Sequence, residues 1–371
     1  MTRPPKILLL IPHLGGGGAE QVTTLLANGL SHEKYELHLG LMTEQESGSF
    51  SALPWIAVHA LGAARVRAAA FPLLRLVWSL KPALILSGMA HLNFLVLLLR
   101  PILPSGTAVL VRQNATVSAV LASGAVPSYT RLLYRWLYRH ADRIICQTRA
   151  MADDLRRELA LAGDCVAVLP NPVNVDQIQC ALSEPPSEWT GPGPHLLAVG
   201  RLSQEKGFDL LLRAFAAARE RFPCADLTIV GGGPEDAPLK AQCRTLGLED
   251  AVHFTGPIAC PYAYFPGATL FVLSSRHEGL PNALLEAAAG GLPLVALPSS
   301  GGVVNLIQGQ PGVWIATEVS AEALAATLLD ALLALRPGER FAHTFVEQFR
   351  FDRVIAVYER LIDATLERSQ P

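Results

Sequence analysis

The sequence predicts an α/β protein with two Rossmann-like, doubly wound domains. Short apolar runs alternate with segments of helical period along the whole chain, which is the pattern of βαβ units and parallel sheets. The alternation stops near residue 184 and restarts at residue 195, so it describes two sheets. The length of 371 residues also exceeds what one ordinary core occupies and fits two domains of common size.

Six apolar runs in the first half are expected to be the strands of one parallel sheet: Ile7–Ile11, Tyr35–Leu41, Ala83–Leu86, Ala108–Arg112, Arg143–Gln147 and Val166–Leu169. Six further runs are expected to form the second sheet: His195–Val199, Asp226–Val230, Val252–Phe254, Thr269–Leu273, Leu292–Ala296 and Val313–Ala316. Open α/β folds bind ligands beyond the carboxyl ends of their strands. Two such domains therefore predict a ligand-binding interdomain cleft.

The domain boundary is predicted in a segment of linker composition. Residues 184–194 contain four prolines and two glycines, which favour extended and turn conformations. We therefore predict an N-terminal domain over 1–183, a linker over 184–194 and a C-terminal domain over 195–350. Residues 351–371 are expected to form a helix that could return to pack on the first domain, because one of its faces is apolar.

Composition excludes several classes of protein. Half of the residues are hydrophobic and 17% are charged, so the chain is not disordered. A formal net charge of −2 gives no general attraction to nucleic acid, and no nucleic-acid partner is expected. The six cysteines lack metal-ligand spacing, and reduced cysteines suit the cytoplasm. The apolar runs are too short for a signal peptide or a transmembrane helix.

A glycine loop, Leu14–Glu20, follows the first predicted strand directly. Glycine lets the backbone approach a ligand closely, and the start of the next helix offers unpaired N–H groups to an anion. An ordinary strand-to-helix turn is the alternative, but four consecutive glycines exceed what a turn requires. The spacing is not G-x-G-x-x-G with a distant acidic partner, which argues against a nicotinamide cofactor.

Two cations, Arg201 and Lys206, lie on the loop after the first strand of the second sheet. A guanidinium can grip phosphate oxygens in a two-pronged fashion, while an ammonium adds a mobile point charge. The pair would suit a diphosphate whose negative charge grows as its bond to a sugar breaks. A solvated loop with a salt bridge to Glu205 explains these two residues about equally well.

Two carboxylates flank a predicted helix start in the segment Ser274–Glu286. Pro281 is suited to the first helical position, which places Glu278 in the loop before the helix and Glu286 two turns into it. One carboxylate can contact a sugar while the other accepts both hydroxyls of a ribose, and the helix amino end favours phosphate. The alternative makes Glu278 a helix-dipole partner and Glu286 a surface residue. The small apolar residues after Glu286 argue against that alternative, because a buried carboxylate needs a partner.

Four motifs in the second half carry a resemblance to a known family: V-G-R-L-x-x-x-K-G from Val199, I-V-G-G-G-P from Ile229, F-x-G from Phe254, and E-x7-E from Glu278. In this order and spacing the chain resembles the retaining glycosyltransferases called glycosyl transferases group 1, or family 4, over essentially its whole length. The resemblance implies the GT-B fold. It further implies an acceptor-binding first domain and a second domain that binds a nucleotide-sugar.

The resemblance also implies roles for single residues. Arg201 and Lys206 would bind the donor diphosphate, Glu278 would contact the transferring sugar and Glu286 would bind the ribose, with Arg201, Lys206 and Glu278 forming the catalytic set. Further donor contacts are implied for Gly17, Gly18, Ile258, Gly279, Leu280 and Asn282. Gly231–Gly233 would shape the pocket, although a tight turn explains these glycines nearly as well.

The mechanism that the resemblance implies is front-face substitution with retention at the sugar. A donor phosphate oxygen would take the acceptor proton as the diphosphate leaves, so the two glutamates are not a glycosidase-type pair. No metal or cofactor is expected, because the nucleotide-sugar is a co-substrate and the sequence has no Asp-x-Asp or His cluster.

The chain departs from the family pattern at three places. Glu278-Gly279-Leu280-Pro281-Asn282 replaces the common E-G-F-G-L and resembles branches that use UDP-activated hexoses or N-acetylhexosamines. Gln113 lies where members often carry a histidine, so no general base is expected there. Ser299–Val304 lies where an acidic segment is common.

The acceptor is expected to be a glycan or a lipid-linked sugar of cell-envelope polysaccharide, lipopolysaccharide or glycolipid synthesis. Polar residues that follow first-domain strands are its candidate contacts, although plain loop contacts would explain them as well: His91, Asn93, Arg112 and Asn114. Arg65–Trp78 and Tyr129–Arg139 mix cations with aromatic residues, so they could lie on an anionic membrane or be scaffold helices with solvated arginines. We favour peripheral contact with the inner face of the cytoplasmic membrane.

Two other functions are compatible with this fold. A non-hydrolysing nucleotide-sugar epimerase shares the two-domain architecture, but R-x4-K with E-x7-E is not its signature. A nucleotide-sugar-binding subunit without activity would not need the intact set of Arg201, Lys206, Glu278 and Glu286.

Overall fold

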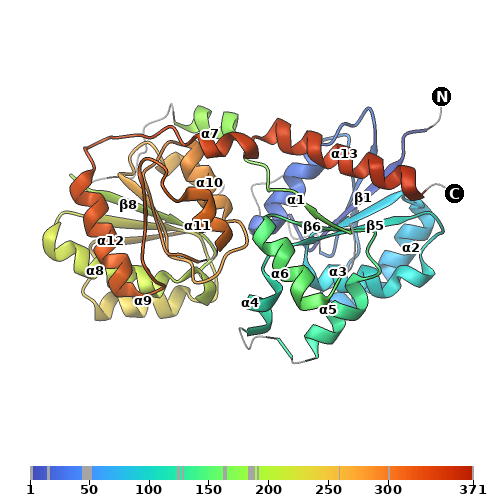
Figure 1. Ribbon diagram of the computed structural model, residues 1–371, viewed down its shortest axis with the longest axis horizontal. Helices are drawn as coiled ribbons and strands as arrows, with labels where there is room; N and C mark the ends of the chain where they lie inside the picture. Colours follow the sequence, from blue (N-terminus) through green and yellow to red (C-terminus); the bar gives the residue numbers. More distant parts are fainter. Residues whose placement is uncertain are drawn as a thin grey trace. The chain divides into compact units, whose positions relative to one another are not determined.

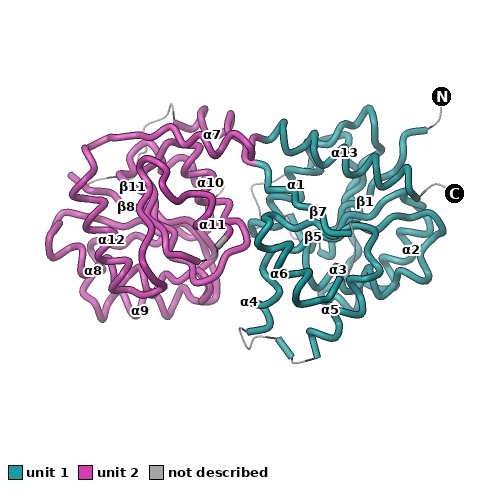
Figure 2. The backbone as a smooth tube through the Cα atoms, viewed as in Figure 1, with its two compact units in different colours: residues 1–172, 351–371 teal, residues 173–350 magenta. Residues whose placement is uncertain are grey.

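The computed structural model describes residues 3–14, 17–43, 52–122, 126–127, 129–161, 165–182, 189, 192–258, 260–299 and 301–369. The chain forms two compact units, shown in Figure 2. Unit 1 comprises residues 1–172 and 351–371, and unit 2 comprises residues 173–350. Each unit is built around one parallel sheet with helices on both faces (Figure 1), so the predicted pair of Rossmann-like domains is confirmed.

The sheet of unit 1 has seven parallel strands in the order β3-β2-β1-β4-β5-β6-β7. Their bounds are Lys6–Ile11 (β1), Glu36–Leu41 (β2), Ala57–Ala60 (β3), Leu84–Ser87 (β4), Ala108–Gln113 (β5), Arg143–Cys146 (β6) and Val166–Val168 (β7). The six predicted strands are all present. Strand β3 is not among the predicted ones, because this four-residue edge strand is largely exposed and lacks the apolar run of a buried strand.

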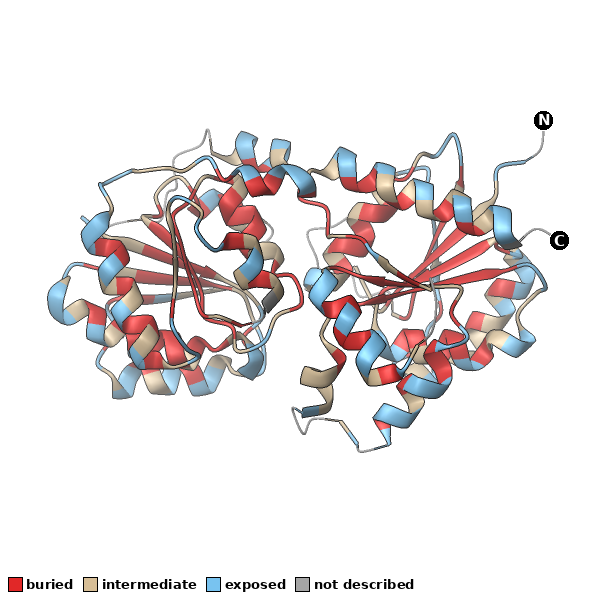
Figure 3. Ribbon diagram, viewed as in Figure 1, coloured by how far each residue is buried: buried red, intermediate tan, exposed pale blue. Residues whose placement is uncertain are grey.

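Alternate residues of the strands in unit 1 are buried in two separate hydrophobic cores, one on each face of the sheet. On β1, Leu8 and Leu10 pack on one face of the sheet, while Ile7 and Leu9 pack on the other. The first core is covered by α2, α3, α5 and α6, and the second by α1 and α13. Figure 3 shows the buried strands between these helices.

The helices of unit 1 are α1 (Gly18–Gly29), η1 (Val66–Ala69), α2 (Ala70–Leu80), α3 (Ala90–Leu99), η2 (Arg100–Ile102), α4 (Val117–Ala122), α5 (Thr130–Tyr138), α6 (Arg149–Leu159) and α13 (Phe351–Ser369).

The C-terminal helix α13 belongs to unit 1 although all of unit 2 precedes it in the sequence. Val354, Tyr358 and Ile362 are buried in the same core as Ile7 of β1. The contact with α1 is close, because a Cβ at Gly29 would lie 2.6 Å from Cδ1 of Ile355. Its apolar face therefore completes the hydrophobic cover on this side of the first sheet.

The sheet of unit 2 has six parallel strands in the order β10-β9-β8-β11-β12-β13. Their bounds are His195–Val199 (β8), Asp226–Val230 (β9), Val252–Gly256 (β10), Leu270–Leu273 (β11), Leu294–Ala296 (β12) and Val313–Ile315 (β13). The helices of unit 2 are α7 (Val175–Ala181), η3 (Gln204–Lys206), α8 (Phe208–Arg221), α9 (Asp236–Thr245), η4 (Pro261–Tyr264), α10 (Asn282–Ala289), α11 (Gly301–Ile307), α12 (Ala321–Ala334) and η5 (Thr344–Phe349). No helix among the described residues is long and apolar enough to cross a membrane.

The division between the units lies earlier in the chain than the predicted linker. Helix α7 packs against α10, and Val173 and Ile178 are buried in a core of unit 2. Residues 173–182 therefore belong to unit 2, because their apolar side chains are buried there. Most of the predicted linker, 184–194, lies outside the described residues.

Candidate functional site

Two loops at the carboxyl edge of the second sheet are held together at Gly207. Gly207 has a φ of +64°, and a Cβ there would lie 2.1 Å from the carbonyl oxygen of Ser274. The loop after β8 can therefore approach the loop after β11 only with glycine at this position. The Ser274 hydroxyl donates to the Lys206 carbonyl at 2.8 Å, and the Arg276 amide donates to the Glu205 carbonyl at 2.8 Å.

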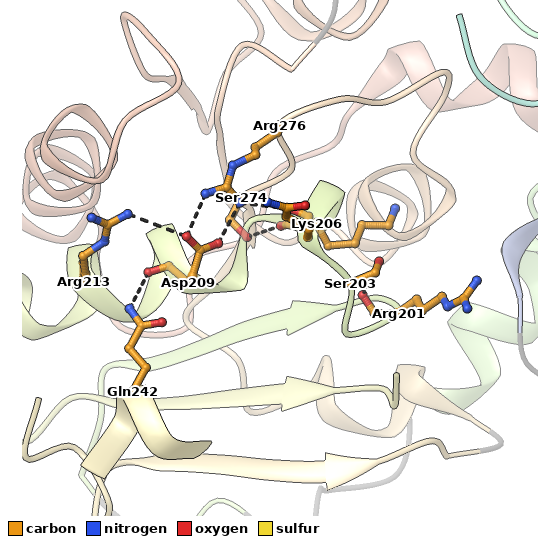
Figure 4. Close-up of polar contacts among 9 residues, drawn as sticks. Arg201, Ser203, Lys206, Asp209, Arg213, Gln242, Ser274 and Arg276 are labelled. Atoms are coloured by element: carbon orange, nitrogen blue, oxygen red, sulfur yellow. Dashed lines mark hydrogen bonds and ion pairs between the residues drawn. The ribbon is translucent and has the colours of Figure 1, made fainter. Parts of the chain in front are cut away.

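An ion pair between Arg276 and Asp209 also holds these two loops together. Both terminal nitrogens of Arg276 donate to the carboxylate of Asp209, at 2.6 and 2.7 Å (Figure 4). Burial alone would raise the pKa of Asp209, but the hydrogen bonds and charge of Arg276 bring that pKa below its usual value. Arg276 also donates to the Gln204 carbonyl at 2.9 Å. No role for Arg276 is predicted from the sequence, and this geometry makes it a positioning residue for the loop that carries Lys206.

The joined loops bring Lys206 and Glu278 into direct contact. Nζ of Lys206 lies 2.6 Å from Oε1 of Glu278, and the Ser275 hydroxyl donates to the same oxygen at 2.6 Å. The side chain of Lys206 is 26% exposed and that of Glu278 is 10% exposed. This is a partly desolvated charge pair, in which the lysine is the more exposed partner. The alternative in which the lysine pairs with Glu205 is not what the structure shows, since Glu205 accepts from Ser203 at 2.6 Å.

Arg201 lies near this pair but contributes differently. Its side chain is exposed, and it extends to the same side of the loop as Lys206, away from the Asp209–Arg276 pair (Figure 4). Among the described residues its guanidinium has no hydrogen-bond or ion-pair partner. One loop therefore carries an exposed guanidinium and a partly buried ammonium, two groups that are suited to binding phosphate.

Glu286 is 8% exposed and lies on α10, which starts at Asn282. It therefore lies about one turn into the helix, one turn fewer than predicted. The Tyr262 hydroxyl donates to Oε1 of Glu286 at 3.1 Å. The predicted need for a partner is thus met by Tyr262, which no sequence motif singles out because η4 reaches Glu286 only through the tertiary fold.

The remaining donor-side candidates of unit 2 differ in how far they are buried. Gly279 and Leu280 are buried immediately before α10, Asn282 is half-buried as its first residue, and Ile258 is half-buried after β10. Gly231 and Gly233 pack against backbone instead: Cβ atoms there would lie 1.9 Å from the Gly200 oxygen and 2.3 Å from the Leu202 oxygen. Close approach between the loops after β8 and β9 accounts for both of these glycines.

The glycine loop of unit 1 leads into α1, whose N-cap residue is Gly17. Gly17 precedes α1 and Gly18 is its first residue, while Gly15 and Gly16 lie outside the described residues. A Cβ at Gly17 would lie 2.1 Å from Oε2 of Glu20, which is 8% exposed. A carboxylate therefore lies against the helix amino end that is predicted to receive an anion. The donor role of Gly17 and Gly18 stays a prediction.

Two of the four acceptor-side candidates are interior residues of unit 1. Asn93 is fully buried and donates to the Arg112 carbonyl at 2.8 Å and to the Tyr138 hydroxyl at 3.1 Å. Arg112 is 1% exposed and donates to Tyr358 at 3.1 Å and to Asn171 at 2.6 Å. Both side chains therefore connect parts of unit 1 and do not present a ligand surface in this structure.

The other two acceptor-side candidates are more accessible. His91 is exposed in the first turn of α3. Asn114 follows β5, donates to the Gly88 carbonyl and accepts from Gln147 at 3.0 Å. Gln113 points inward, where it accepts from the Tyr138 hydroxyl at 2.8 Å. An acceptor role for His91 and Asn114 stays a prediction.

The sequence is similar to known glycosyltransferases in both halves of the chain. Residues 193–333 match the family described as Glycosyl transferases group 1, and residues 16–177 match Glycosyltransferase Family 4. A lipopolysaccharide core biosynthesis glycosyltransferase, LpsE of Rhizobium meliloti, is 28% identical over 63% of this chain and 66% of its own length. The N-acetylgalactosamine-N,N'-diacetylbacillosaminyl-diphospho-undecaprenol 4-alpha-N-acetylgalactosaminyltransferase of Campylobacter jejuni is 27% identical over 81% of this chain and 83% of its own.

Solved structures share the fold. A sucrose-phosphate synthase from Thermosynechococcus elongatus has a TM-score of 0.80 at 18% identity, covering 98% of this chain and 100% of its own. The Anabaena HepE complex with UDP-glucose has a TM-score of 0.76 at 17% identity, covering 97% of this chain and 100% of its own.

Among the first curated relatives, the matches span from 32% to 66% of each relative's own length.

Proposed function

Because the chain belongs to the glycosyltransferases of group 1 and family 4, we propose that it transfers a hexose or an N-acetylhexosamine from a nucleotide-sugar to a glycan or lipid-linked acceptor. A UDP-sugar is the favoured donor and the configuration at the sugar is retained. The acceptor belongs to cell-envelope polysaccharide, lipopolysaccharide or glycolipid synthesis, and the enzyme acts in the cytoplasm. The relatives that act on lipopolysaccharide and on a diphospho-undecaprenol-linked sugar support this acceptor class.

The observation that carries the proposal is the Lys206–Glu278 pair with the exposed Arg201 beside it. The acceptor hydroxyl attacks the anomeric carbon on the face from which the nucleoside diphosphate departs. The bond from that carbon to the phosphate oxygen breaks, and the acceptor proton passes to that oxygen. Negative charge on the diphosphate grows during this step. A fixed ammonium and a guanidinium stabilise the growing charge without reorganisation.

Glu278 and Glu286 bind neutral parts of the donor in this proposal. Glu278 is held by Lys206 and Ser275, so its second carboxylate oxygen can accept from a sugar hydroxyl. Glu286 accepts from Tyr262, and its carboxylate oxygens contact the ribose hydroxyls in this proposal. The amino end of α10 lies between the two residues in sequence and favours the phosphates. UDP as the favoured nucleotide is supported by the Pro281-Asn282 variant and by the UDP-glucose complex of HepE.

The test is incubation of the full chain with UDP-, GDP- and ADP-sugars in the absence of acceptor. We expect slow release of one nucleoside diphosphate from one preferred donor, with the α-linked product appearing when an acceptor glycan is added. Formation of an isomeric nucleotide-sugar would instead identify an epimerase. Thermal stabilisation by nucleotide with no release would identify a binding subunit, and either result contradicts the proposal.

A further inference from the structure

We propose that one face of unit 1 docks on an anionic lipid bilayer. This face, which we call the three-helix surface, is the outer side of α2, of α3 with η2, and of α5. It carries six exposed large apolar side chains: Phe71, Trp78, Leu98, Ile102, Leu132 and Trp136. None of them belongs to the donor site in unit 2, so the proposal goes beyond the sugar-transfer function.

The three helices form one continuous layer. Residues of α2, α3 and α5 are buried in the same core on one face of the first sheet. Helix α3 contacts both α2 and α5 along that face. The indole nitrogen of Trp78 donates to the Ile102 carbonyl at 3.1 Å, which ties the end of α2 to η2. Since the inner sides of the helices share a core, their outer sides are neighbours. Figure 3 shows exposed residues along the outer sides of α2 and α5.

The apolar side chains are arranged in rows on their helices. On α2, Phe71, Arg75 and Trp78 follow one another at spacings of four and three residues, and all are exposed. On α5, Leu132 and Trp136 are one turn apart. Phe71 is 76% exposed and Leu132 is 67% exposed. Apolar patches of this kind mark interaction surfaces, and tryptophan is favoured where an apolar layer meets water.

The excess of positive charge in the part of the chain that forms the three-helix surface favours an anionic partner. The sequence has no Asp or Glu between Glu46 and Asp142, yet nine Arg and Lys residues lie in that stretch. Six of them are exposed and form no ion pair within the described part of the chain: Arg65, Arg67, Arg75, Lys81, Arg135 and Arg139. Arginine-flanked apolar rows are typical of helices that lie in the headgroup region of anionic membranes.

The opposite face of unit 1 lacks this character. Its outer helix α13 alternates cations with acids, namely Arg353, Arg360 and Arg368 with Asp352, Glu359, Asp363 and Glu367. Both faces cover the same sheet, so their difference is not a requirement of the fold. A lipid surface explains why acids are absent and large apolar groups are exposed on the same three helices. The long stems of the arginines can lie along the apolar layer while their guanidinium groups reach phosphate.

The test is co-sedimentation of the full chain with vesicles of phosphatidylcholine alone or of an equimolar mixture with phosphatidylglycerol. We expect binding to the anionic vesicles that weakens in high salt and is lost in pure phosphatidylcholine. The variant Phe71→Ser/Trp136→Ser should weaken binding by about tenfold or more. Arg75→Ala and Arg139→Ala should each weaken it by about fivefold.

Matched controls keep the test specific. Leu333 of α12 is 64% exposed in unit 2, so Leu333→Ser removes a comparable apolar group from another surface. Arg353→Ala/Arg360→Ala removes two cations from α13. Both controls should bind vesicles like the wild type, and circular dichroism should show that every variant is folded.

Three outcomes would overturn the proposal. One is equal binding of the wild type to both kinds of vesicle, and another is wild-type binding by the Phe71→Ser/Trp136→Ser variant. The third is that the wild type binds no vesicles and forms a concentration-dependent dimer that the Phe71→Ser/Trp136→Ser variant does not form. A second copy of the chain would then cover the surface. Release of nucleoside diphosphate in solution should be unchanged in all of these variants, so failure here is distinguishable from failure of the proposed transferase activity.

Discussion

Nζ of Lys206 lies 2.6 Å from Oε1 of Glu278, although the two residues are 72 positions apart in the chain. The contact exists because Gly207 lets two loops of the second sheet touch. A cation proposed to bind diphosphate and a carboxylate proposed to bind sugar are therefore preorganised as one unit. The ammonium keeps donors for a second anion, since it has three N–H groups and one of them is used by Glu278.

Gly207→Ala should lower the free energy of unfolding by about 2–4 kcal/mol, because left-handed backbone and a backbone clash both penalise alanine. Gly247 is a matched control, since it has a φ of +66° and no atom lies within 4 Å of the position that a Cβ would take there. Gly247→Ala should therefore cost only about 1–2 kcal/mol. Urea unfolding measures both values. Equal losses in the two variants would show that the contact with Ser274 contributes nothing.

Lys206→Ala and Arg201→Ala should each reduce kcat by about 10²–10³-fold while the protein stays folded. The physical reason is the loss of a positive charge beside the diphosphate as it departs. Lys240→Ala is the control, because Lys240 forms a surface pair with Asp236 on α9. Turnover with the preferred donor is the measurement. Near-wild-type turnover of Lys206→Ala or Arg201→Ala would contradict the assigned role.

Glu286→Gln should remove the preference for a ribose with both hydroxyls. A carboxylate accepts hydrogen bonds from two hydroxyls, whereas an amide offers a single acceptor oxygen. Calorimetric titration with UDP and with 2′-deoxy-UDP measures the effect. The wild type should bind UDP more tightly by about 1.5–3 kcal/mol, the value of a hydrogen bond to a charged group.

The glutamine variant should bind the two nucleotides nearly alike. Tyr262→Phe serves as the companion variant, since it removes the hydroxyl that orients Glu286 and keeps the ring. It should show a smaller loss of the same preference. If Glu286→Gln discriminates between the nucleotides as well as the wild type does, Glu286 does not bind the ribose.

Cys146 should make the protein less stable as the pH rises. Burial raises the pKa of its thiol to about 12, whereas an unfolded thiol ionises near pH 8.5. The unfolded chain therefore loses this proton first, and stability should fall between about pH 8.5 and 12 with a slope of up to ~1.4 kcal/mol per pH unit. Unfolding free energies at pH 8, 9 and 10 measure the slope.

The variant Cys146→Ala should reduce that slope, whereas Cys180→Ala should not, because Cys180 is exposed. The alanine variant also loses buried volume, so its stability at pH 8 should be lower than that of the wild type. The informative quantity is how the difference in unfolding free energy between the wild type and Cys146→Ala changes with pH. A difference that is constant from pH 8 to 10 would show that the native thiol ionises as the unfolded one does.

Much of the architecture is accessible from local sequence patterns. Apolar runs bounded by turn residues predict all strands except β3, whose exposed edge position removes the apolar signal. The boundary between the units is predicted too late, because α7 is held in unit 2 by burial of Val173 and Ile178, a long-range effect. Arg112 and Asn93 are predicted as ligand contacts from their places after strands. Their burial depends on side chains from α13 and α5, which no local pattern shows.

The sequence by itself determined the class of the protein, because glycines, prolines and charged residues at set spacings specify loops at strand ends and the chemistry that those loops can carry. Only the tertiary structure decided which charges meet. It paired Lys206 with Glu278 and left Arg201 exposed, and it provided Tyr262 for Glu286. Such pairings depend on the approach of distant loops to within a few ångströms, and spacing along the chain carries no information about that distance.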